Sequence, residues 1–161
     1  AVRVITSDST PDYWRKFLGV LKRLLRPLGG AFHVFYEEFA YFTGVYLSAR
    51  RLRNVAFALI HAQDVRSGVA ASLALGRRVP VVLTCHFNDD PVTELREQFG
   101  LRGWFLGGLE NWYRWLFAQV KRYVFVSQYA YEKSKRLLPD GISKRILPNT
   151  VRIGGSRPVG N

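Results

Sequence analysis

The sequence predicts an α/β domain in which helices cover both faces of a mostly parallel β-sheet, a three-layer sandwich. Short runs of β-branched and aliphatic residues alternate with longer segments whose apolar residues recur every three or four positions. Most of the short runs are apolar throughout, which is typical of strands buried on both faces. We expect one domain over residues 1–152. Residues 153–161, where Gly, Pro and Arg prevail, are expected to be a flexible tail or the start of an interdomain linker.

The first third of the chain predicts two strands and two helices. Val2–Thr6 is a β-branched run that ends in a polar loop, so a strand is expected there. Asp12–Arg26 follows with apolar residues at helical spacing and basic residues between them. After a break at proline and glycine, Phe32–Tyr36 predicts a second strand. The ambiguous segment Phe39–Arg53 favours a helix that ends in a basic cluster.

The rest of the chain alternates more regularly. Strands are expected at Val55–Ala62, Val79–Thr84, Tyr123–Val126 and Lys144–Leu147. Helices are expected at Ser67–Leu75, from the end of the loop CHFNDDPVTE to Phe99, at Leu109–Val120 and, capped by Ser127, at Tyr129–Leu138. A glycine-punctuated break is expected at Gly100–Gly108. Strands that alternate with helices indicate βαβ units, and hence parallel strands.

Composition and charge narrow the classes of partner. The 161 residues carry a net charge of +12, which calls for an anionic partner: nucleic acid, an anionic membrane or a phosphorylated small molecule. The positive surplus lies in residues 1–60 and 121–161, whereas residues 61–120 are neutral. Nucleic acid is the least favoured partner, because the aromatic residues lie within expected helices and strands and form no recognisable stacking platform.

The single cysteine, Cys85, helps to predict the cellular compartment. It excludes an internal disulfide framework and a zinc cluster built from several thiolates. We expect it to be an inert packing residue at the end of a buried strand. No segment has the length of a spanning helix, and the N-terminus does not resemble a signal peptide. The expected compartment is the cytoplasm, with a peripheral position at the inner face of the cell membrane as an option.

Polar residues gather where the expected strands end. Ligands of open parallel sheets bind outside the carboxyl ends of the strands, so these positions are the candidate site. The positions are Ser7-Asp8-Ser9, His61 to Asp64, Thr84 to Phe87, Ser127-Gln128 and Pro148-Asn149.

Three segments, in this order, carry a resemblance to a known family. IHAQDVRSGVAASLALGRRVPVVLTCH resembles the strand, turn, small-residue helix and PVVxTxH strand of family 4 glycosyltransferases. RYVFVSQYAYEKSKRLL is similar to the VxxVSxxxxxxL strand and helix of that family, and KRILPNTV to its strand that ends in PNG. The resemblance extends from Asn54 to Arg152, and the first fifty residues match only in outline.

The resemblance implies half of a GT-B enzyme, in which two Rossmann-like domains face each other across a cleft. The N-terminal domain binds the acceptor, here a glycan, a lipid-linked or another membrane-associated molecule. The C-terminal domain binds most of the nucleotide-sugar donor, partly through a Glu-x7-Glu motif. By resemblance this chain is the N-terminal domain of a retaining hexosyltransferase, and we expect little activity from it alone. No GxGxxG fingerprint is present, which counts against NAD or FAD, and no cofactor is expected.

His86 is the candidate catalytic residue. By resemblance it matches the histidine of the TxH turn and lies in the cleft, where its imidazole can hydrogen-bond a sugar hydroxyl. A strand-end histidine satisfied by the backbone is the alternative. No carboxylate stands out as a nucleophile, so the protein is expected to contribute positioning and charge.

The remaining cleft candidates carry structural alternatives. The acceptor or cleft-binding set is Ser7, Asp8, Ser9, His61, Asp64, Asp89, Ser127 and Asn149. Structural turn roles are favoured for His61, Asp64 and Asn149, and Asp64 is a possible cap of the helix that starts near Ser67. Asp89 is more simply a solvated loop charge. The family places paired glycines where Ser7-Asp8-Ser9 stands, and Asp8 would repel a phosphate. Only three histidines occur, and no metal site is expected.

The helix Asp12–Arg26 is the candidate membrane contact, because a basic face combined with aromatic residues suits an anionic bilayer interface. The residues concerned are Trp14, Arg15, Lys16, Lys22, Arg23 and Arg26. An ordinary helix packed on the sheet is the alternative. The matching alternative function is a non-catalytic basic module that binds an anionic membrane or a phosphorylated ligand.

Overall fold

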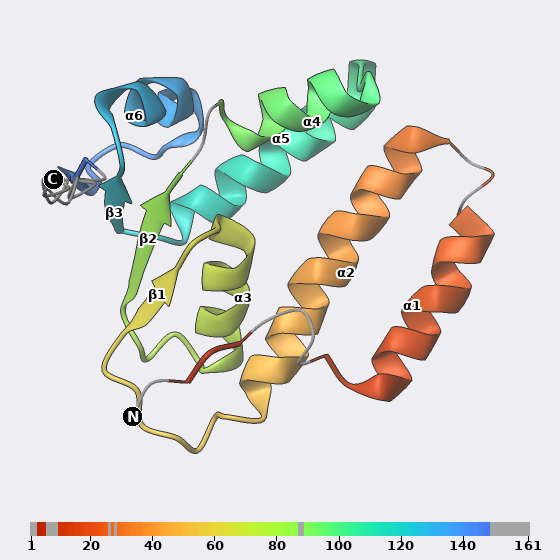
Figure 1. The fold of residues 1–161 in the computed structure, drawn as a ribbon, viewed down its shortest axis with the longest axis horizontal. Coiled ribbons are helices and arrows are strands. Elements are labelled where there is room, and N and C mark those ends of the chain that lie inside the picture. Colours follow the sequence, from red (N-terminus) through yellow and green to blue (C-terminus); the bar gives the residue numbers. More distant parts are fainter. Residues whose placement is uncertain (1–2, 6–9, 26, 28, 87–88, 149–161) are drawn as a thin grey trace, which may run out of the picture.

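A parallel sheet and the helices between its strands make up the described part of the chain (Figure 1). The computed structural model describes residues 3–5, 10–25, 27, 29–86 and 89–148. The strands are β1 (Ile60–Ala62), β2 (Val81–Cys85), β3 (Arg122–Phe125) and β4 (Ser143–Ile146). The helices are α1 (Asp12–Leu25), α2 (Gly30–Arg50), α3 (Val65–Ala74), α4 (Pro91–Phe99), α5 (Gly103–Ala118), α6 (Gln128–Ser134) and the 3-10 turn η3 (Lys135–Leu137).

The sheet confirms the predicted α/β class. Its strands lie in the order β1-β2-β3-β4, and every pair is parallel. The register aligns Ala62 with Leu83, Leu83 with Tyr123, and Tyr123 with Lys144. Each connection carries at least one helix, as parallel strands require. The carboxyl ends of all four strands therefore lie along one edge of the sheet.

One face of the sheet forms the core. Leu83 and Cys85 of β2 and Tyr123 and Phe125 of β3 are buried, and they share one apolar cluster with residues of α3, α5 and α6. Residues of opposite parity are less covered: Val82 and Val124 are half-buried, His61, Arg122 and Arg145 are exposed, and Thr84 is a buried exception. The described helices thus pack on one face, where the sequence predicts helices on both.

The helices form two layers beside the sheet (Figure 1). α3 approaches β1 so closely that a Cβ at Gly68 would lie 2.8 Å from the Cβ of Ala62. α2 packs outside α3 and α5, with Phe42 in edge contact with Trp112 of α5 at 5.2 Å between ring centroids. α1 is outermost and packs on α2. The order of layers is therefore sheet, inner helices, outer helices.

The largest error of the sequence prediction concerns α2. The expected strand Phe32–Tyr36 is helical and is continuous with most of the expected helix Phe39–Arg53, in one helix that begins at Gly30 and ends at Arg50. Gly29, with φ of 95°, marks the break before it. α2 contacts α1 on one side and α3 and α4 on others, and its Phe42 and Glu38 contact α5, so apolar residues occupy most of its surface. Such a helix lacks the three-to-four spacing that identifies a one-sided helix.

Two strand predictions and one loop prediction also need correction. Arg3–Ile5, the described part of the expected strand Val2–Thr6, is not in a strand. Within the described residues it has no paired neighbour, and an extended segment without a neighbour forms no ladder. Only Ile60–Ala62 of the expected strand Val55–Ala62 pairs. The expected break at Gly100–Gly108 is mostly helical, because α5 begins at Gly103.

Candidate functional site

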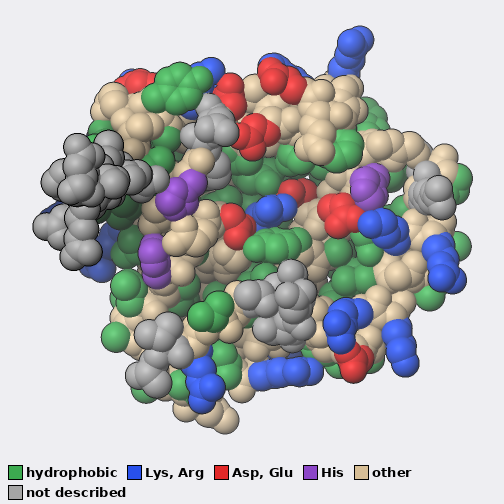
Figure 2. Space-filling model, viewed as in Figure 1, with side chains coloured by type: hydrophobic (Ala, Val, Ile, Leu, Met, Phe, Trp, Pro, Cys, Tyr) green, Lys and Arg blue, Asp and Glu red, His purple; other side chains and the backbone are tan. Residues whose placement is uncertain are grey.

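The carboxyl edge of the sheet brings the two strand-end histidines to the same region. His61 lies in β1, with its Nε2 2.8 Å from Oγ1 of Thr84 in β2. His86 directly follows β2 and is exposed. Figure 2 shows histidine side chains near each other on the side of the molecule where β1 and β2 end. The sequence places His33 in a strand, but it lies in α2.

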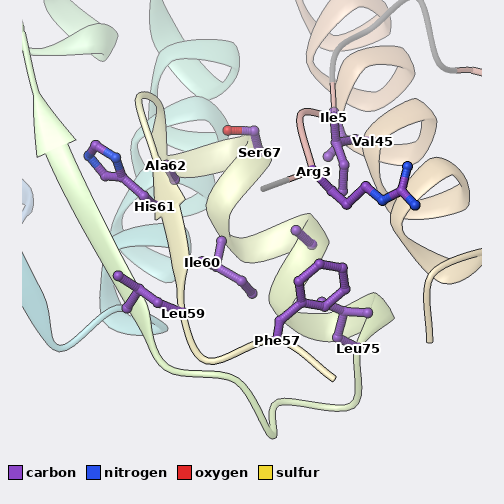
Figure 3. Close-up of a pocket in the computed structure, with 11 residues that line it drawn as sticks. Arg3, Ile5, Val45, Phe57, Leu59, Ile60, His61, Ala62, Ser67 and Leu75 are labelled. Carbon is purple, nitrogen blue, oxygen red and sulfur yellow. The ribbon is translucent and has the colours of Figure 1, made fainter. Parts of the chain in front are cut away.

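The hydrogen bond between His61 and Thr84 joins the ends of neighbouring strands on the face of the sheet opposite to the helices. Figure 3 shows the His61 ring on the β2 side of β1, whereas Ser67 belongs to α3 on the other side. Thr84 is buried, while the His61 ring is exposed. The hydrogen bond orients a solvent-accessible imidazole, which is a group able to donate to or accept from a sugar hydroxyl.

Asp64 has the capping role that the sequence offers as an alternative. It is the N-cap of α3, and its Oδ1 accepts from the backbone N–H of Ser67 at 3.0 Å. Its Oδ2 accepts from the Tyr41 hydroxyl at 2.9 Å. Burial raises the pKa of Tyr41 to about 12, so this hydroxyl stays a donor at neutral pH. Both oxygens of Asp64 are therefore engaged.

The loop after His86 contains two carboxylates with different environments. Asp89 pairs with Lys133 of α6 at 3.0 Å, and that hydrogen bond lowers the pKa of Asp89. Asp90 is buried, caps α4 through the N–H groups of Val92 and Thr93, and binds Arg136 with its Oδ1 2.7 Å from Nη2. Asp89 is thus a paired charge instead of the solvated loop charge favoured from the sequence.

The remaining cleft candidates divide into one capping residue and a group that lies outside the described residues. Ser127 caps α6, and its hydroxyl accepts from the N–H of Ala130 at 3.0 Å. The cleft candidates outside the described residues are Ser7, Asp8, Ser9 and Asn149, and Arg26 of the membrane set also lies outside them. The structure therefore joins His61 to Thr84, places His86 two residues after Thr84 at the same strand end, and engages Asp64, Asp89 and Ser127 in local structure.

Sequence reasoning missed a buried polar cluster beside this edge. Glu38 of α2 is only 4 % exposed, and its Oε1 accepts from Arg66 Nη1 at 2.7 Å and from the Tyr113 hydroxyl at 3.1 Å. Its Oε2 accepts from Nε1 of Trp112 at 3.3 Å. Burial raises the pKa of Glu38 despite these donors. The guanidinium of Arg66 also lies over the Tyr41 ring, at 4.5 Å.

This cluster lines an open polar pocket between α3 and α4. Arg66 and Tyr113 meet there with Glu94 and Gln98 of α4. Figure 2 shows acidic and basic side chains together in the middle of this face, over the junction of α2 and the inner helices. A signal was present in the sequence, because Glu38 is an acidic residue within an aromatic stretch and stands at helical spacing from Val34 and Val45. The mistaken strand at Phe32–Tyr36 concealed that spacing.

A second pocket lies on the other side of β1. Figure 3 shows it between β1, α3 and the segment that carries Arg3 and Ile5. Its lining is mainly apolar and includes Ile60, Ala71 and Leu75. Arg3, His61 and Ser67 are its polar lining residues, so it shares His61 with the candidate site, but its described lining contains no carboxylate and we do not assign it a role.

The candidate membrane residues of α1 have several environments. Trp14 is half-buried, stacked on Phe17 at 5.0 Å and near Phe39 at 6.2 Å. Arg15 pairs with Asp12, and Lys22 pairs with Glu37 at 2.8 Å. The other two described basic residues, Lys16 and Arg23, are exposed.

Three further observations concern the whole described part. Cys85 is a buried free cysteine, and burial raises its pKa to about 12. No group of three potential ligands is placed to hold a metal ion within residues 3–148 as described. None of the described helices has the length and apolarity needed to cross a membrane.

Comparison with known proteins gives one match. The sequence model described as Glycosyltransferase Family 4 matches residues 1–153. No curated protein and no solved structure matches the chain.

Proposed function

The chain belongs to glycosyltransferase family 4, and from this premise we propose that it is the acceptor-binding half of a retaining glycosyltransferase. The family indicates glycosyl transfer. We further propose that the donor is a nucleotide sugar, held mainly by a second domain. The acceptor is a glycan, or a lipid-linked or other membrane-associated molecule. The observation that carries the proposal is the pair of accessible imidazoles, His61 and His86, at the carboxyl edge of a family 4 sheet.

His86 is the residue that we propose to contact the transferring sugar. It is exposed and follows directly after β2, a buried strand that fixes its backbone. An imidazole there can accept a hydrogen bond from a sugar hydroxyl or donate one to it. His61 is held by Thr84 and is proposed to provide a second, oriented contact. Fixed groups of this kind accelerate transfer by positioning and by stabilising developing charge.

The described carboxylates near this edge are each held by a helix cap or a cationic partner, so none of them is assigned as a nucleophile. Asp64 caps α3 and accepts from Tyr41, Asp89 pairs with Lys133, and Asp90 is buried against Arg136. These engagements support a mechanism in which the domain binds and orients the acceptor. The polar pocket lined by Arg66, Glu94 and Gln98 offers both donors and acceptors to an acceptor rich in hydroxyl groups.

The test is a transfer assay on the full polypeptide that contains residues 1–161. Uridine- and guanosine-diphosphate hexoses are supplied with glycan and lipid-linked acceptors, and the anomeric configuration of the product is read by NMR. We expect retention. We expect His86→Ala to lower kcat by about a hundredfold, the size of loss seen when one transition-state hydrogen bond is removed.

His33→Ala is the matched control. His33 lies in α2 next to Glu37, away from the sheet edge, so its replacement should leave transfer unchanged. Wild-type rates in His86→Ala would show that this residue has no catalytic contact. Inversion of the anomeric centre, or no transfer from any donor, would contradict the proposed reaction itself.

A further inference from the structure

We propose that the outer face of α1 is a docking surface for an anionic lipid bilayer. This face is a stripe of four apolar side chains that point to solvent: Tyr13, Phe17, Val20 and Leu24, exposed by 65, 51, 57 and 66 %. They recur at intervals of four, three and four residues, so they lie in one line along the helix. Phe39 of α2, half exposed, lies next to this helix against Trp14.

The stripe is distinct from the face by which α1 packs on the protein. Leu18 is buried, its carbonyl accepts from the Tyr36 hydroxyl of α2 at 2.8 Å, and Leu21 and Leu25 on the same side are half-buried. Trp14 is on this inner side as well. The helix therefore has a second apolar face that its packing does not use. Single exposed apolar residues are common on protein surfaces, but a contiguous line of them marks an interaction site.

The charges beside the stripe select the partner. Lys16 and Arg23 border it on the side away from α2, and within the described residues neither forms an ion pair. Arg15 and Lys22, by contrast, are engaged by Asp12 and Glu37. A line of apolar side chains bordered by unpaired cations complements an anionic bilayer, in which the apolar side chains enter the acyl boundary and the cations meet phosphate.

A second copy of this chain fits the surface less well. A two-fold contact through the stripe would bring Lys16 and Arg23 of one copy close to the same cations of the other, and the net charge of +12 adds to the repulsion. The lipid surface thus satisfies both the apolar and the cationic component. It is a property of α1 and does not depend on the transferase reaction.

The experiment is vesicle co-sedimentation of the 161-residue chain, with phosphatidylcholine vesicles that contain or lack phosphatidylglycerol, at rising NaCl. We expect binding that requires the anionic lipid and weakens with salt. The double variant Phe17→Ser with Leu24→Ser should reduce the partition coefficient by about tenfold or more, because it removes two of the four apolar side chains of the stripe. Lys16→Gln with Arg23→Gln should reduce it by about twenty-five-fold, at roughly fivefold for each cation.

Two matched controls separate the stripe from general effects. Trp104→Ser removes an aromatic residue on α5 that is 72 % exposed, and it should leave binding unchanged. Arg53→Gln with Arg78→Gln removes two exposed charges outside α1, so it should have much less effect than the pair on α1. Circular dichroism of each variant checks that the helices are intact.

Each other outcome overturns the proposal. Vesicle binding that is absent, or that is indifferent to anionic lipid, removes the lipid partner. Equal losses in the Arg53/Arg78 and Lys16/Arg23 variants assign the effect to net charge. Equal losses in Trp104→Ser and the stripe variant assign it to any exposed apolar residue. If the stripe variants leave vesicle binding unchanged and alter only the oligomeric state in analytical ultracentrifugation without lipid, the stripe is an interface between copies of the chain instead of a lipid-binding surface. The assay uses neither donor nor acceptor, so its failure leaves the proposed transfer reaction untouched, and the reverse holds.

Discussion

The Nε2 atom of His61 lies 2.8 Å from the Oγ1 atom of Thr84, which joins the carboxyl ends of β1 and β2 by a side-chain hydrogen bond. The two residues are 23 positions apart in the sequence, and parallel pairing brings them together. Thr84 is buried and has little freedom, so it acts as the fixed partner of an exposed ring. Because this hydrogen bond orients His61, a substitution of the buried Thr84 should disturb the proposed site.

Thr84→Val tests this relationship. Valine keeps the shape of threonine but cannot hydrogen-bond His61, so the ring loses its orientation. In the full polypeptide we expect the transfer rate to fall roughly tenfold. The loss of stability should be only about 1 kcal/mol, measured by urea unfolding.

Ser48→Ala is the control for Thr84→Val. Ser48 is buried in α2 and donates to the carbonyl of Gly44 at 2.8 Å, so its replacement also removes one buried hydrogen bond. It should cost a similar amount of stability and leave transfer unchanged. Equal effects of the two variants on transfer would mean that the His61–Thr84 bond is purely structural.

Glu38→Ala is expected to be strongly destabilising. The substitution leaves Arg66, Tyr113 and Trp112 without the acceptor that they share in the interior. Breaking a buried ion pair on one side costs about 3–5 kcal/mol, and the partial exposure of Arg66 places the expected loss near the lower value. Glu38→Gln keeps one acceptor oxygen and should lose about half as much. Urea unfolding at neutral pH measures both, and a loss below about 1 kcal/mol for the alanine variant would contradict the assignment.

The pH dependence of Glu38 has a definite sign. Burial raises its pKa above the usual 4.5, so the folded chain holds this proton more tightly than the unfolded chain. The resulting contribution to stability is present below pH 4.5 and is lost as pH rises through the raised pKa of the folded state. Glu38→Gln does not titrate. The difference in unfolding free energy between wild type and Glu38→Gln should therefore change with pH in this window and be flat well above it.

Asp90→Ala should destabilise the region between α4 and η3. Asp90 caps α4 and binds Arg136, so the variant loses a cap and a buried ion-pair partner together. A cap is worth about 1 kcal/mol and the buried partner adds more, which gives an expected loss of about 2–4 kcal/mol in thermal or urea unfolding.

Asp89→Asn is the neighbouring control for Asp90→Ala. Asp89 also forms an ion pair, but its partner Lys133 is more than a third exposed, so the expected loss is at most about 1 kcal/mol. If Asp89→Asn cost as much as Asp90→Ala, burial would not be what distinguishes the two aspartates.

Cys85 should resist alkylation in the folded chain. It is fully buried, and burial raises its pKa to about 12, so the reactive thiolate is scarce at pH 8. Iodoacetamide labelling should be slow in buffer and fast in urea. Since this is the only cysteine, the mass shift reports on it alone. Equal labelling rates in the two conditions would show that β2 opens readily.

The second half of the fold could be predicted because its signals are local. The strands that became β2 and β3 are short apolar runs, and the helices α3, α4 and α6 begin at side chains that cap them, Asp64, Asp90 and Ser127. The prediction for the segment that forms α2 was wrong for a physical reason. The surface of this helix is covered from several sides, so its apolar residues do not form one stripe, and aromatic residues such as Phe32 and Phe35 suit a strand equally well.

The candidate site was predicted in part. The strand-end rule identified His61 and His86 from their positions alone. It could not find the cluster around Glu38, because its members come from three helices. Arg66 is 28 positions and Tyr113 75 positions from Glu38 in the sequence. It also could not tell that the carboxylates Asp64 and Asp89 are engaged by Tyr41 and Lys133. Such partners are decided by packing.

By itself the sequence determined the α/β class, the parallel order of the later strands, the neutral middle segment and the histidines at the strand ends, since each depends on residues close together along the chain. The tertiary structure decided which charged side chains form ion pairs and which remain unpaired on the surface. On α1 it buried Leu18 and left Phe17 and Leu24 in solvent, and it paired Lys22 while leaving Lys16 and Arg23 unpaired within the described residues. Helical periodicity identifies the faces of a helix, but only the contact with α2 determines which apolar face is buried.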